Sequence, residues 1–327
     1  MPIGLGLASS HAPGMYVPED LLQPAYEGVI ARSMDKGNVI PKSANAITKE
    51  VLPEHWTRFR NGHSTLRKQL EGYNPDAVIF VGGDQNEMFD SSNKVNAHIF
   101  VGPEASGINP YSSVRARFGT VDWAKPENLV RYKTDVELAN FLANELIVRE
   151  HFDISVAHEF KALSGGRSGA PKGLPHAFYN LAEIMPRPDL PTVLIYVNTY
   201  DPPAMISAAR CYDLGRALAR TLEKDKRRIA ILGSGGLTHD PGGPRNPWAD
   251  QPLDKWVLEQ ISTGNGEALK EMFVFDSMTL RGGTGEIRAW ITVAGAMEYM
   301  KSKAKVVDYL GDATELQCGV GFAYWNT

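Results

Sequence analysis

The feature that most constrains this sequence is the alternation of short apolar runs with longer amphipathic segments. Runs rich in β-branched residues are typical of buried strands, and they occur at Ile3–Leu7, Ala77–Val81, His98–Val101, Ile154–Ala157, Thr192–Val197 and Arg228–Leu232. Amphipathic segments of helical length lie between several of these runs or after the last one, at Glu54–Leu70, Thr134–Glu150, Pro203–Leu222 and Ala289–Lys303. This alternation predicts an α/β fold with a central, mostly buried sheet flanked by helices.

The chain length and the distribution of loop residues predict one domain. The 327 residues, 43% of them hydrophobic, are enough to bury one large core or two modest ones. The sequence has no internal repeat, and its Pro- and Gly-rich stretches near 163–175 and 233–247 are short. We therefore expect a single domain spanning residues 1–327.

The charge and cysteine content exclude several classes of protein. Lys and Arg number 34 and Asp and Glu 38, a net charge of −4, which argues against a protein that coats nucleic acid or an anionic membrane. The two cysteines, Cys211 and Cys318, are too few for a disulfide framework or a thiolate zinc cluster. The N-terminus lacks the pattern of a signal peptide, and no apolar run reaches the length of a membrane helix. We expect a cytoplasmic protein with a small-molecule partner.

Several polar side chains follow directly after predicted strands. His11 comes after GLGLASS, Asp84 and Gln85 after AVIFVGG, and His239 after RIAILGSGGLT. Glu286 follows a glycine-rich turn and precedes a predicted helix. Open α/β sheets bind ligands beyond the carboxyl ends of their strands, and two imidazoles with a carboxylate suit a non-haem iron or zinc centre.

Each of these residues also has a structural interpretation. A single histidine is more often hydrogen-bonded structure than catalyst, and Glu286 by itself fits a charge at a helix N-terminus. His63 shares one face of a predicted helix with apolar residues, which favours the core. His158 follows a predicted strand and His176 precedes a predicted helix, so both can face the same cleft. Phosphate-binding P-loop, dinucleotide-binding and G-x-S-x-G motifs are absent from the sequence.

Taken together, these segments resemble the type III extradiol ring-cleavage dioxygenases, in particular the protocatechuate 4,5-dioxygenase β-subunit and the gallate dioxygenases. The resemblance covers most of the chain. Its most specific parts are SSHAP, VIFVGGDQNEMFD, VNTYDPP, GSGGLTH and GTGE. It implies a class III extradiol catalytic-subunit fold, a catalytic Fe(II), and a catechol-type aromatic substrate that is opened with O2.

The resemblance also implies roles for individual residues. His11 and Glu286 would be iron ligands, His239 the acid–base residue, and His176 or His158 a histidine that contacts substrate. The family usually supplies its second histidine ligand from an Asn-Asp-His turn, where this sequence has Gly-Asp-Gln ending at Gln85. Gln85 is the preferred replacement because an amide is neutral, like imidazole. The alternatives are that His63 or His158 completes the site, or that the iron has been lost.

The sequence supports only general expectations about the substrate, the partners and the competing functions. The carboxylate of a protocatechuate-like substrate needs a cationic or hydrogen-bonding partner, and the sequence offers four candidates: Arg167, Lys172, Arg210 and Arg281. We expect a homo-oligomer, with a small partner subunit as a further possibility. The competing functions are a zinc-dependent or other metal-assisted hydrolase that uses His11 and Glu286, and a non-catalytic small-molecule-binding protein.

Overall fold

The computed structural model describes residues 3–90, 92–159, 173–200 and 202–327. Within these residues the main sheet has eight strands in the order β6-β3-β7-β2-β8-β1-β10-β9. The strands are β1 (Ile3–Ser9), β2 (Ala77–Gly82), β3 (Ala97–Phe100), β6 (Ile154–Ala157), β7 (Thr192–Val197), β8 (Ile229–Ser234), β9 (Lys305–Leu310) and β10 (Val320–Asn326).

The centre of the sheet is parallel. Strand β2 pairs in parallel with both β7 and β8, and β8 pairs in parallel with β1. These four strands are buried along their whole length, as expected for parallel strands covered on both faces. Strand β3 runs antiparallel to β7 on one side, and β10 runs antiparallel to β1 on the other. All four carboxyl ends of the central strands therefore meet at one edge.

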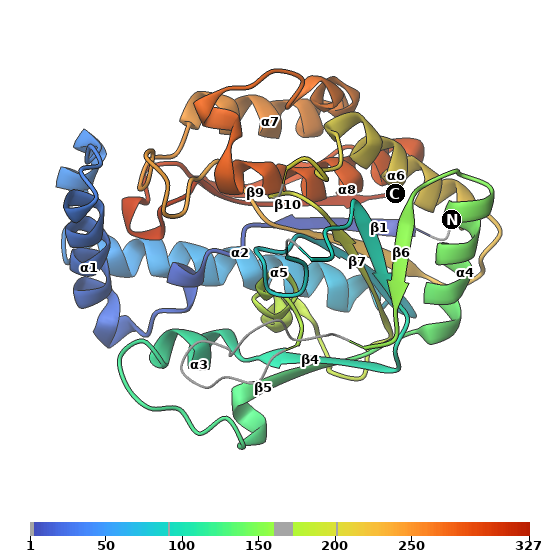
Figure 1. The fold of residues 1–327 in the computed structure, drawn as a ribbon, viewed down its shortest axis with the longest axis horizontal. Coiled ribbons are helices and arrows are strands. Elements are labelled where there is room, and N and C mark those ends of the chain that lie inside the picture. Colours follow the sequence, from blue (N-terminus) through green and yellow to red (C-terminus); the bar gives the residue numbers. More distant parts are fainter. Residues whose placement is uncertain (1–2, 91, 160–172, 201) are drawn as a thin grey trace.

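Helices cover both faces of the sheet (Figure 1). They are α1 (Leu22–Asp35), α2 (Val51–Tyr73), α3 (Pro110–Arg115), α4 (Val136–Val148), α5 (His176–Tyr179), α6 (Ala208–Thr221), α7 (Gln251–Thr263) and α8 (Ile287–Tyr299). One hydrophobic cluster joins the sheet to α4, α6, α7 and α8, and a second joins its other face to α1 and α2. Consecutive residues of β2 alternate between the two clusters, because a strand points its side chains to opposite faces.

Two glycines let α6 and α8 approach closely. A Cβ at Gly215 would lie 1.9 Å from the carbonyl oxygen of Thr292, and one at Gly295 would lie 2.1 Å from that of Tyr212. Any larger residue would separate these helices. Their contact holds α8 against the sheet and so fixes its N-terminus, where Glu286 lies.

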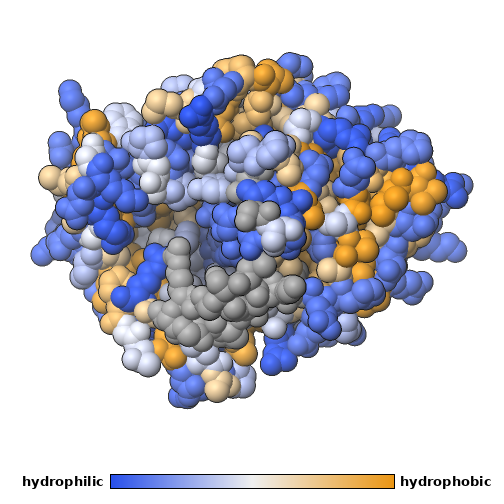
Figure 2. Space-filling model, viewed as in Figure 1, coloured by the Kyte–Doolittle hydropathy of each residue, from blue (hydrophilic) through white to orange (hydrophobic). Residues whose placement is uncertain are grey.

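A second, smaller sheet extends from the main one. It pairs β4 (Glu104–Ile108) with β5 (Leu129–Lys133) in antiparallel register, and α3 follows β4 directly. Figure 2 shows a mostly hydrophilic face with apolar surface gathered on the side of α4 and β6, where Phe141, Val148 and Val156 are exposed. No helix in the described part of the chain has both the length and the apolar character needed to cross a bilayer.

The predicted α/β fold with a buried sheet is confirmed. The six predicted strands and four predicted helices are all present, with boundaries that shift by a few residues. Several elements were not predicted from the sequence: helices α1, α3 and α7, the small β4–β5 sheet, and the C-terminal pair β9 and β10. Strand β10 completes the sheet beside β1 and anchors the loop that carries His11, since Ser10 N donates to the Gly321 carbonyl at 3.0 Å.

Candidate metal centre

The polar residues expected at strand ends do lie at one edge of the sheet. His11 follows β1, Gln85 follows β2 and His239 follows β8, and these are neighbouring strands in the sheet. Glu286 ends a 3-10 turn (Gly282–Glu286) and immediately precedes α8. His176, the first residue of α5, joins them from a distant part of the chain.

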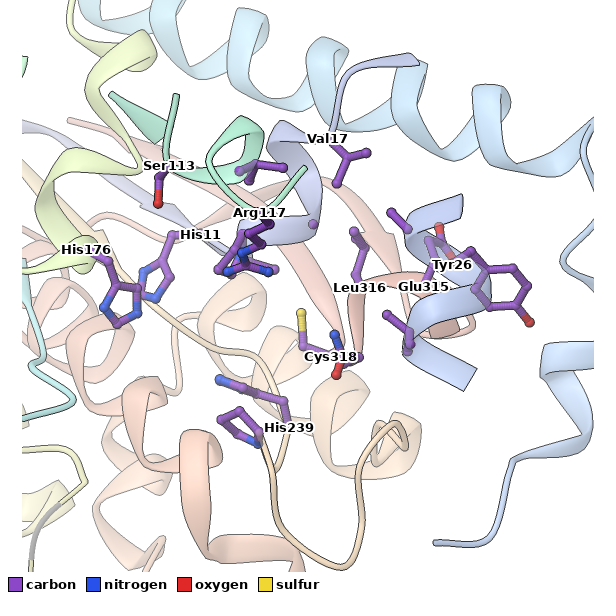
Figure 3. A pocket seen from close by; sticks show the side chains of 18 of the residues that line it. His11, Val17, Tyr26, Ser113, Arg117, His176, His239, Glu315, Leu316 and Cys318 are labelled. Carbon is purple, nitrogen blue, oxygen red and sulfur yellow. The ribbon is translucent and has the colours of Figure 1, made fainter. Parts of the chain in front are cut away.

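These residues line one end of a cavity of about 610 Å³, a size ordinary for small-molecule sites. Its walls come from the loop after β1, helix α1, the region of α3 and the segment before β10. Figure 3 shows His11 and His176 at one end, Tyr26 and Glu315 at the other, and Arg117, Leu316 and Cys318 between them. The polar cluster is therefore the end wall of an elongated pocket.

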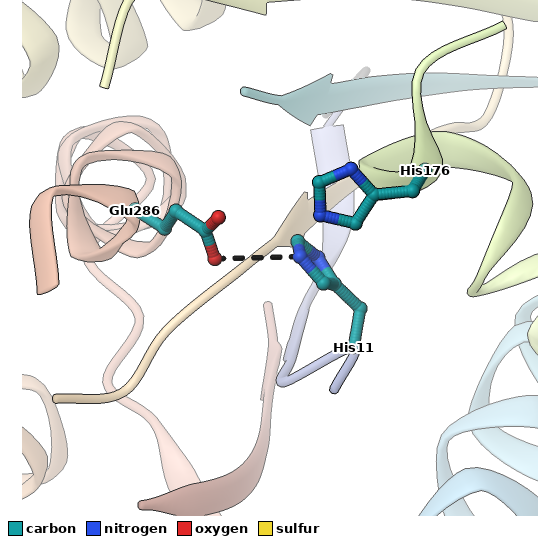
Figure 4. A group of neighbouring side chains, drawn as sticks. All are labelled: His11, His176 and Glu286. Carbon is teal, nitrogen blue, oxygen red and sulfur yellow. Dashed lines mark ion pairs between the residues drawn. The ribbon is translucent and has the colours of Figure 1, made fainter. Parts of the chain in front are cut away.

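His11 is held in one tautomer. Its ring is buried, and its Nδ1 lies 2.8 Å from Ser234 Oγ. The single hydroxyl hydrogen of Ser234 is donated to the carbonyl oxygen of Ala177. Ser234 Oγ must therefore accept from Nδ1–H, which leaves the Nε2 of His11 unprotonated while the ring is neutral. That Nε2 lies 3.3 Å from Glu286 Oε2 (Figure 4).

Glu286 is the buried anion at the centre of the cluster. Its Oε1 accepts from Gln85 Nε2 at 2.8 Å, and its Oε2 accepts from the backbone N–H of Gly236 at 3.1 Å. Gly236 has φ 66°, a conformation that glycine adopts without strain. A Cβ at the preceding Gly235 would lie 2.7 Å from the Cβ of Glu286, so both glycines are needed for this close approach.

His176 is fixed by the carboxylate of Glu87. Both the backbone N–H and the ring Nδ1 of His176 point at this carboxylate, with Nδ1 2.9 Å from each oxygen. The rings of His176 and His11 lie edge to face, with centroids 4.7 Å apart. Nδ1 is thus engaged, and Nε2 is the ring atom of His176 that remains for a ligand.

His239 lies beside this group, next to Glu286. Its Nδ1 is 2.8 Å from the carbonyl oxygen of Leu237, and its Nε2 is 3.7 Å from Glu286 Oε2. A carbonyl only accepts, so Nδ1 carries a hydrogen here too. A Cβ at Gly283 would lie 2.0 Å from Nε2, which shows how closely the glycine-rich turn supports the ring.

Burial and charge act against each other on the ionisable groups. Burial favours the neutral form of Glu286, but the facing His11 and His239 hold the pKa of its carboxyl far below the usual range. Burial lowers the pKa of His11, with Glu286 opposing it. Burial acts likewise on His176, but Glu87 outweighs it and raises the pKa of His176 to about 9. Burial and the neighbouring Glu87 raise the pKa of Asp84 to about 7.

Three side chains form a group that fits a divalent metal. The ligand atoms of His11, His176 and Glu286 all lie within 4.8 Å of one another. Donors bound to one first-row metal at ~2.1 Å lie roughly 3–3.4 Å apart, and the 3.3 Å between His11 and Glu286 is in that range. Two imidazole nitrogens and one carboxylate form the ligand set of non-haem Fe(II) oxygenases. The residues therefore fit such a metal.

The structure places the other expected candidates elsewhere. His63 lies on α2 with its Nδ1 bonded to Glu183, and it is buried in the core as its helical spacing predicted. His158 is exposed, and His63 and His158 are not among the described residues that line the cavity. Gln85 does line the cavity, but its amide nitrogen is the group directed at Glu286.

Two of the four basic residues considered for a substrate carboxylate, Arg210 and Arg281, are described by the structure and do not line the cavity. Arg210 and Arg281 are exposed, Arg210 over the ring of Phe152 and Arg281 paired with Asp276. Arg167 and Lys172 lie outside the described residues.

Among the described residues, Arg32 and Arg117 are arginines that line the cavity. Arg32 is on α1, and Arg117 follows α3 in an irregular segment. Neither lies at the end of a predicted strand, so no pattern in the sequence connected them with the cavity. Glu87 was also missed, although it lies only two residues beyond Gln85.

Comparison with known proteins places the chain in a family. Residues 46–318 match the model for the catalytic LigB subunit of aromatic ring-opening dioxygenase. This span includes Gln85, His176, His239 and Glu286, whereas His11 precedes it.

Several curated relatives carry dioxygenase names. A 2,3-dihydroxyphenylpropionate/2,3-dihydroxicinnamic acid 1,2-dioxygenase from Comamonas testosteroni is 28% identical over 55% of this chain and 48% of its own length. A protein of the same name from Paraburkholderia xenovorans is 22% identical over 80% of this chain and 87% of its own. A gallate dioxygenase from Pseudomonas putida is 31% identical over 28% and 27%.

The matches differ in how much of each chain they cover. The match spans about half the length of the Comamonas protein and most of that from Paraburkholderia. The family match, by contrast, covers most of this chain and contains four of the five polar residues at the end of the cavity. This chain is therefore a member of the family of catalytic LigB subunits of aromatic ring-opening dioxygenases.

Proposed function

We propose that this protein is an Fe(II)-dependent extradiol dioxygenase that opens the ring of a catechol-type aromatic acid. The observation that carries the proposal is the convergence of His11, His176 and Glu286 within 4.8 Å at the end of the cavity. The family membership and the dioxygenase names of the relatives support the same reaction class.

Two of the metal ligands in this proposal are His11 and Glu286, and His176 lies within reach of the same point. Fe(II) bound there would supply the electron transfer that lets a singlet aromatic diol react with triplet O2. The protein's own part is to hold the ligands in place before the metal arrives. Ser234 fixes the ring of His11, and Gly236 together with Gln85 fixes the carboxylate of Glu286.

His239 is the residue placed for proton transfer. Its Nδ1 hydrogen is committed to the Leu237 carbonyl, so Nε2 is the basic atom, and it faces the cavity end beside Glu286. From there Nε2 can take a proton from a substrate hydroxyl and return it later in the reaction. General acid–base catalysis of this kind contributes about 10²–10⁴-fold.

The remaining walls select for a flat ring with an anionic substituent. Val17, Val114 and Leu316 give the cavity an apolar middle that can cover an aromatic ring and exclude water. Arg32 and Arg117 bring positive charge to the same cavity, which suits a substrate carboxylate. Protocatechuate, gallate and 2,3-dihydroxyphenylpropionate combine a diol or triol with a carboxylate, and they are the first compounds to test.

The test is O2 uptake by protein reconstituted with Fe(II) without oxygen and then mixed with these compounds in air-saturated buffer. We expect about one O2 consumed per ring opened, loss of uptake after chelation, and recovery with Fe(II) but not with Zn(II). Uptake that survives complete chelation would disprove the iron dependence. A protein that holds zinc and hydrolyses an ester or amide without O2 would be a metal-assisted hydrolase instead, and one that binds an aromatic acid but no metal would be a binding protein.

A further inference from the structure

The loop that follows β2 is held together by hydrogen bonds to Asp84, and it directs two side chains at the metal centre. Buried Asp84 accepts from the backbone N–H groups of Glu87, Met88 and Phe89 at 3.0–3.2 Å. This turn sets the positions of the two side chains that reach the cluster, Gln85 and Glu87. Each contacts a different member of the cluster.

Gln85 meets the carboxylate of Glu286 with its nitrogen. An amide nitrogen that donates a hydrogen bond has no lone pair for a metal, and the 2.8 Å contact to Oε1 uses this end of the side chain. The contact leaves Oε2 on the side of His11, 3.3 Å from its Nε2. Gln85 therefore orients the carboxylate.

His176 has the surroundings of a metal-ligating histidine. Ligating histidines in proteins usually donate their second ring N–H to a carboxylate or carbonyl, which fixes the tautomer and strengthens the donor. Glu87 does this for Nδ1 of His176 and also accepts its backbone N–H at 3.1 Å, so the ring and the start of α5 are held together. The ring then lies edge to face with that of His11.

We infer that His176 is the third metal ligand, and that Gln85 and Glu87 are positioning residues for Glu286 and His176. The loop after β2 thus supports two ligands and supplies none. His239 does not belong to the group of ligand atoms that lie within 4.8 Å of one another among the described residues. The inference concerns which side chains bind the metal; its iron identity rests on the proposed function.

The test is a calorimetric titration of full-length, metal-free protein with Fe(II) alone, without oxygen. We expect His176→Ala to weaken binding by at least about 100-fold. Glu87→Gln should weaken it by about 10–100-fold, the usual effect of removing the partner of a ligating histidine. Gln85→Ala should cost less than about tenfold. His151→Asn, a change at an exposed histidine with φ 56° that asparagine tolerates, is the matched control and should bind like the parent.

A double variant guards against misfolding as the cause. Gln85→His combined with His176→Ala returns an imidazole to the end of β2, and it should recover at least tenfold of the lost affinity. Circular dichroism and thermal melting of the metal-free proteins show whether each variant is folded. The inference is overturned if folded His176→Ala binds Fe(II) like the parent, or if Gln85→Ala is the variant that loses the metal.

The outcomes separate this inference from the proposed function. If the affinities follow the expected order but the loaded parent consumes no O2 with any aromatic diol, the ligand assignment stands and the dioxygenase proposal fails. If the parent consumes O2 and His176→Ala still binds Fe(II) like the parent, the dioxygenase proposal stands and the ligand assignment fails. A parent that binds neither Fe(II) nor Zn(II) overturns both.

Discussion

Buried histidines face a carboxylate at more than one place among the described residues, and two of these regions are worth comparing because only one of them resembles a reactive site. On α2, the Nδ1 of His63 contacts the Oε1 of Glu183, and its ring packs against Tyr16 and Phe322, with centroids 6.1 and 5.4 Å away. Its Nε2 is buried with no hydrogen-bond partner among the described residues. At the end of the sheet, His11 is just as buried and also faces a carboxylate.

The difference lies in which ring atom meets the carboxylate and what lies beyond it. In the cluster, the Nδ1 atoms of His11, His176 and His239 are all bonded to surrounding groups, and the Nε2 atoms of His11 and His239 face Glu286. The cluster also opens onto a cavity, which His63 does not line. Burial and an ion pair are therefore not enough to identify a metal site. A better criterion for a metal site is that several donor atoms, each on a side chain held by its own hydrogen bond, point toward the same place at the wall of a cavity.

The largest expected effect comes from removing the shared anion. Glu286→Gln keeps the shape of the side chain but removes the negative charge that balances a divalent metal, so Fe(II) affinity should fall by more than about 100-fold and turnover should disappear. The matched control is Glu183→Gln, which removes the carboxylate facing His63. It should reduce the free energy of unfolding by about 1.5–3 kcal/mol, the usual contribution of a hydrogen bond to a charged group, and leave metal binding unchanged.

Metal content and urea unfolding of the two variants provide the measurements. Equal iron content in Glu286→Gln and the parent would mean that Glu286 is only an N-terminal charge for α8. Iron loss in Glu183→Gln as well would mean that the two regions are coupled, and the contrast drawn above would then be wrong.

The next effect separates metal binding from chemistry within the cluster itself. His239→Ala should retain Fe(II) but lose about 10²–10⁴-fold in turnover, because it removes the proposed proton-transfer group and no proposed ligand. Alanine is chosen because the glycine-rich turn packs against this ring, with the would-be Cβ of Gly283 only 2.0 Å from Nε2. Added imidazole should restore part of the rate. Loss of iron in this variant would make His239 a ligand instead.

The sequence predicted the fold better than the outline of the pocket. Parallel strands buried on both faces are continuous apolar runs, so β2, β7 and β8 could be recognised directly. Strand β9 has an exposed end and mixed burial, which weakens its signal. The segments after α3 and before β10 are irregular, and a sequence pattern within such a segment does not predict that it lines the cavity.

The convergence of side chains at one edge of the sheet could be predicted for residues that directly follow strands. His11, Gln85 and His239 follow strands, and the meeting of strand ends at one edge brings them together. His176 was recognised as facing the cleft, but its pairing with Glu87 depends on two segments 89 residues apart. Which nitrogen of each histidine is free depends on such distant partners, and no spacing in the sequence encodes it.

The smallest effect tests a buried histidine that belongs to neither pair. His98 lies on β3 with Nδ1 2.9 Å from Ser155 Oγ and its Nε2 buried without a partner among the described residues. Burial lowers the pKa of His98 to about 4, so folding favours the neutral ring. Stability from this group is complete above pH 6.5, the ordinary pKa, and is lost as the pH falls toward 4. At 1.36 kcal/mol per pKa unit this amounts to about 3 kcal/mol.

His98→Gln cannot titrate, so urea unfolding at several pH values should show a difference in stability between variant and parent that shrinks or reverses on acidification. His151→Asn, an exposed control, should follow the parent throughout. A variant with the parent's full pH dependence would show that folding does not shift the pKa of His98, so that this buried ring takes up a proton as readily in the fold as in the unfolded chain.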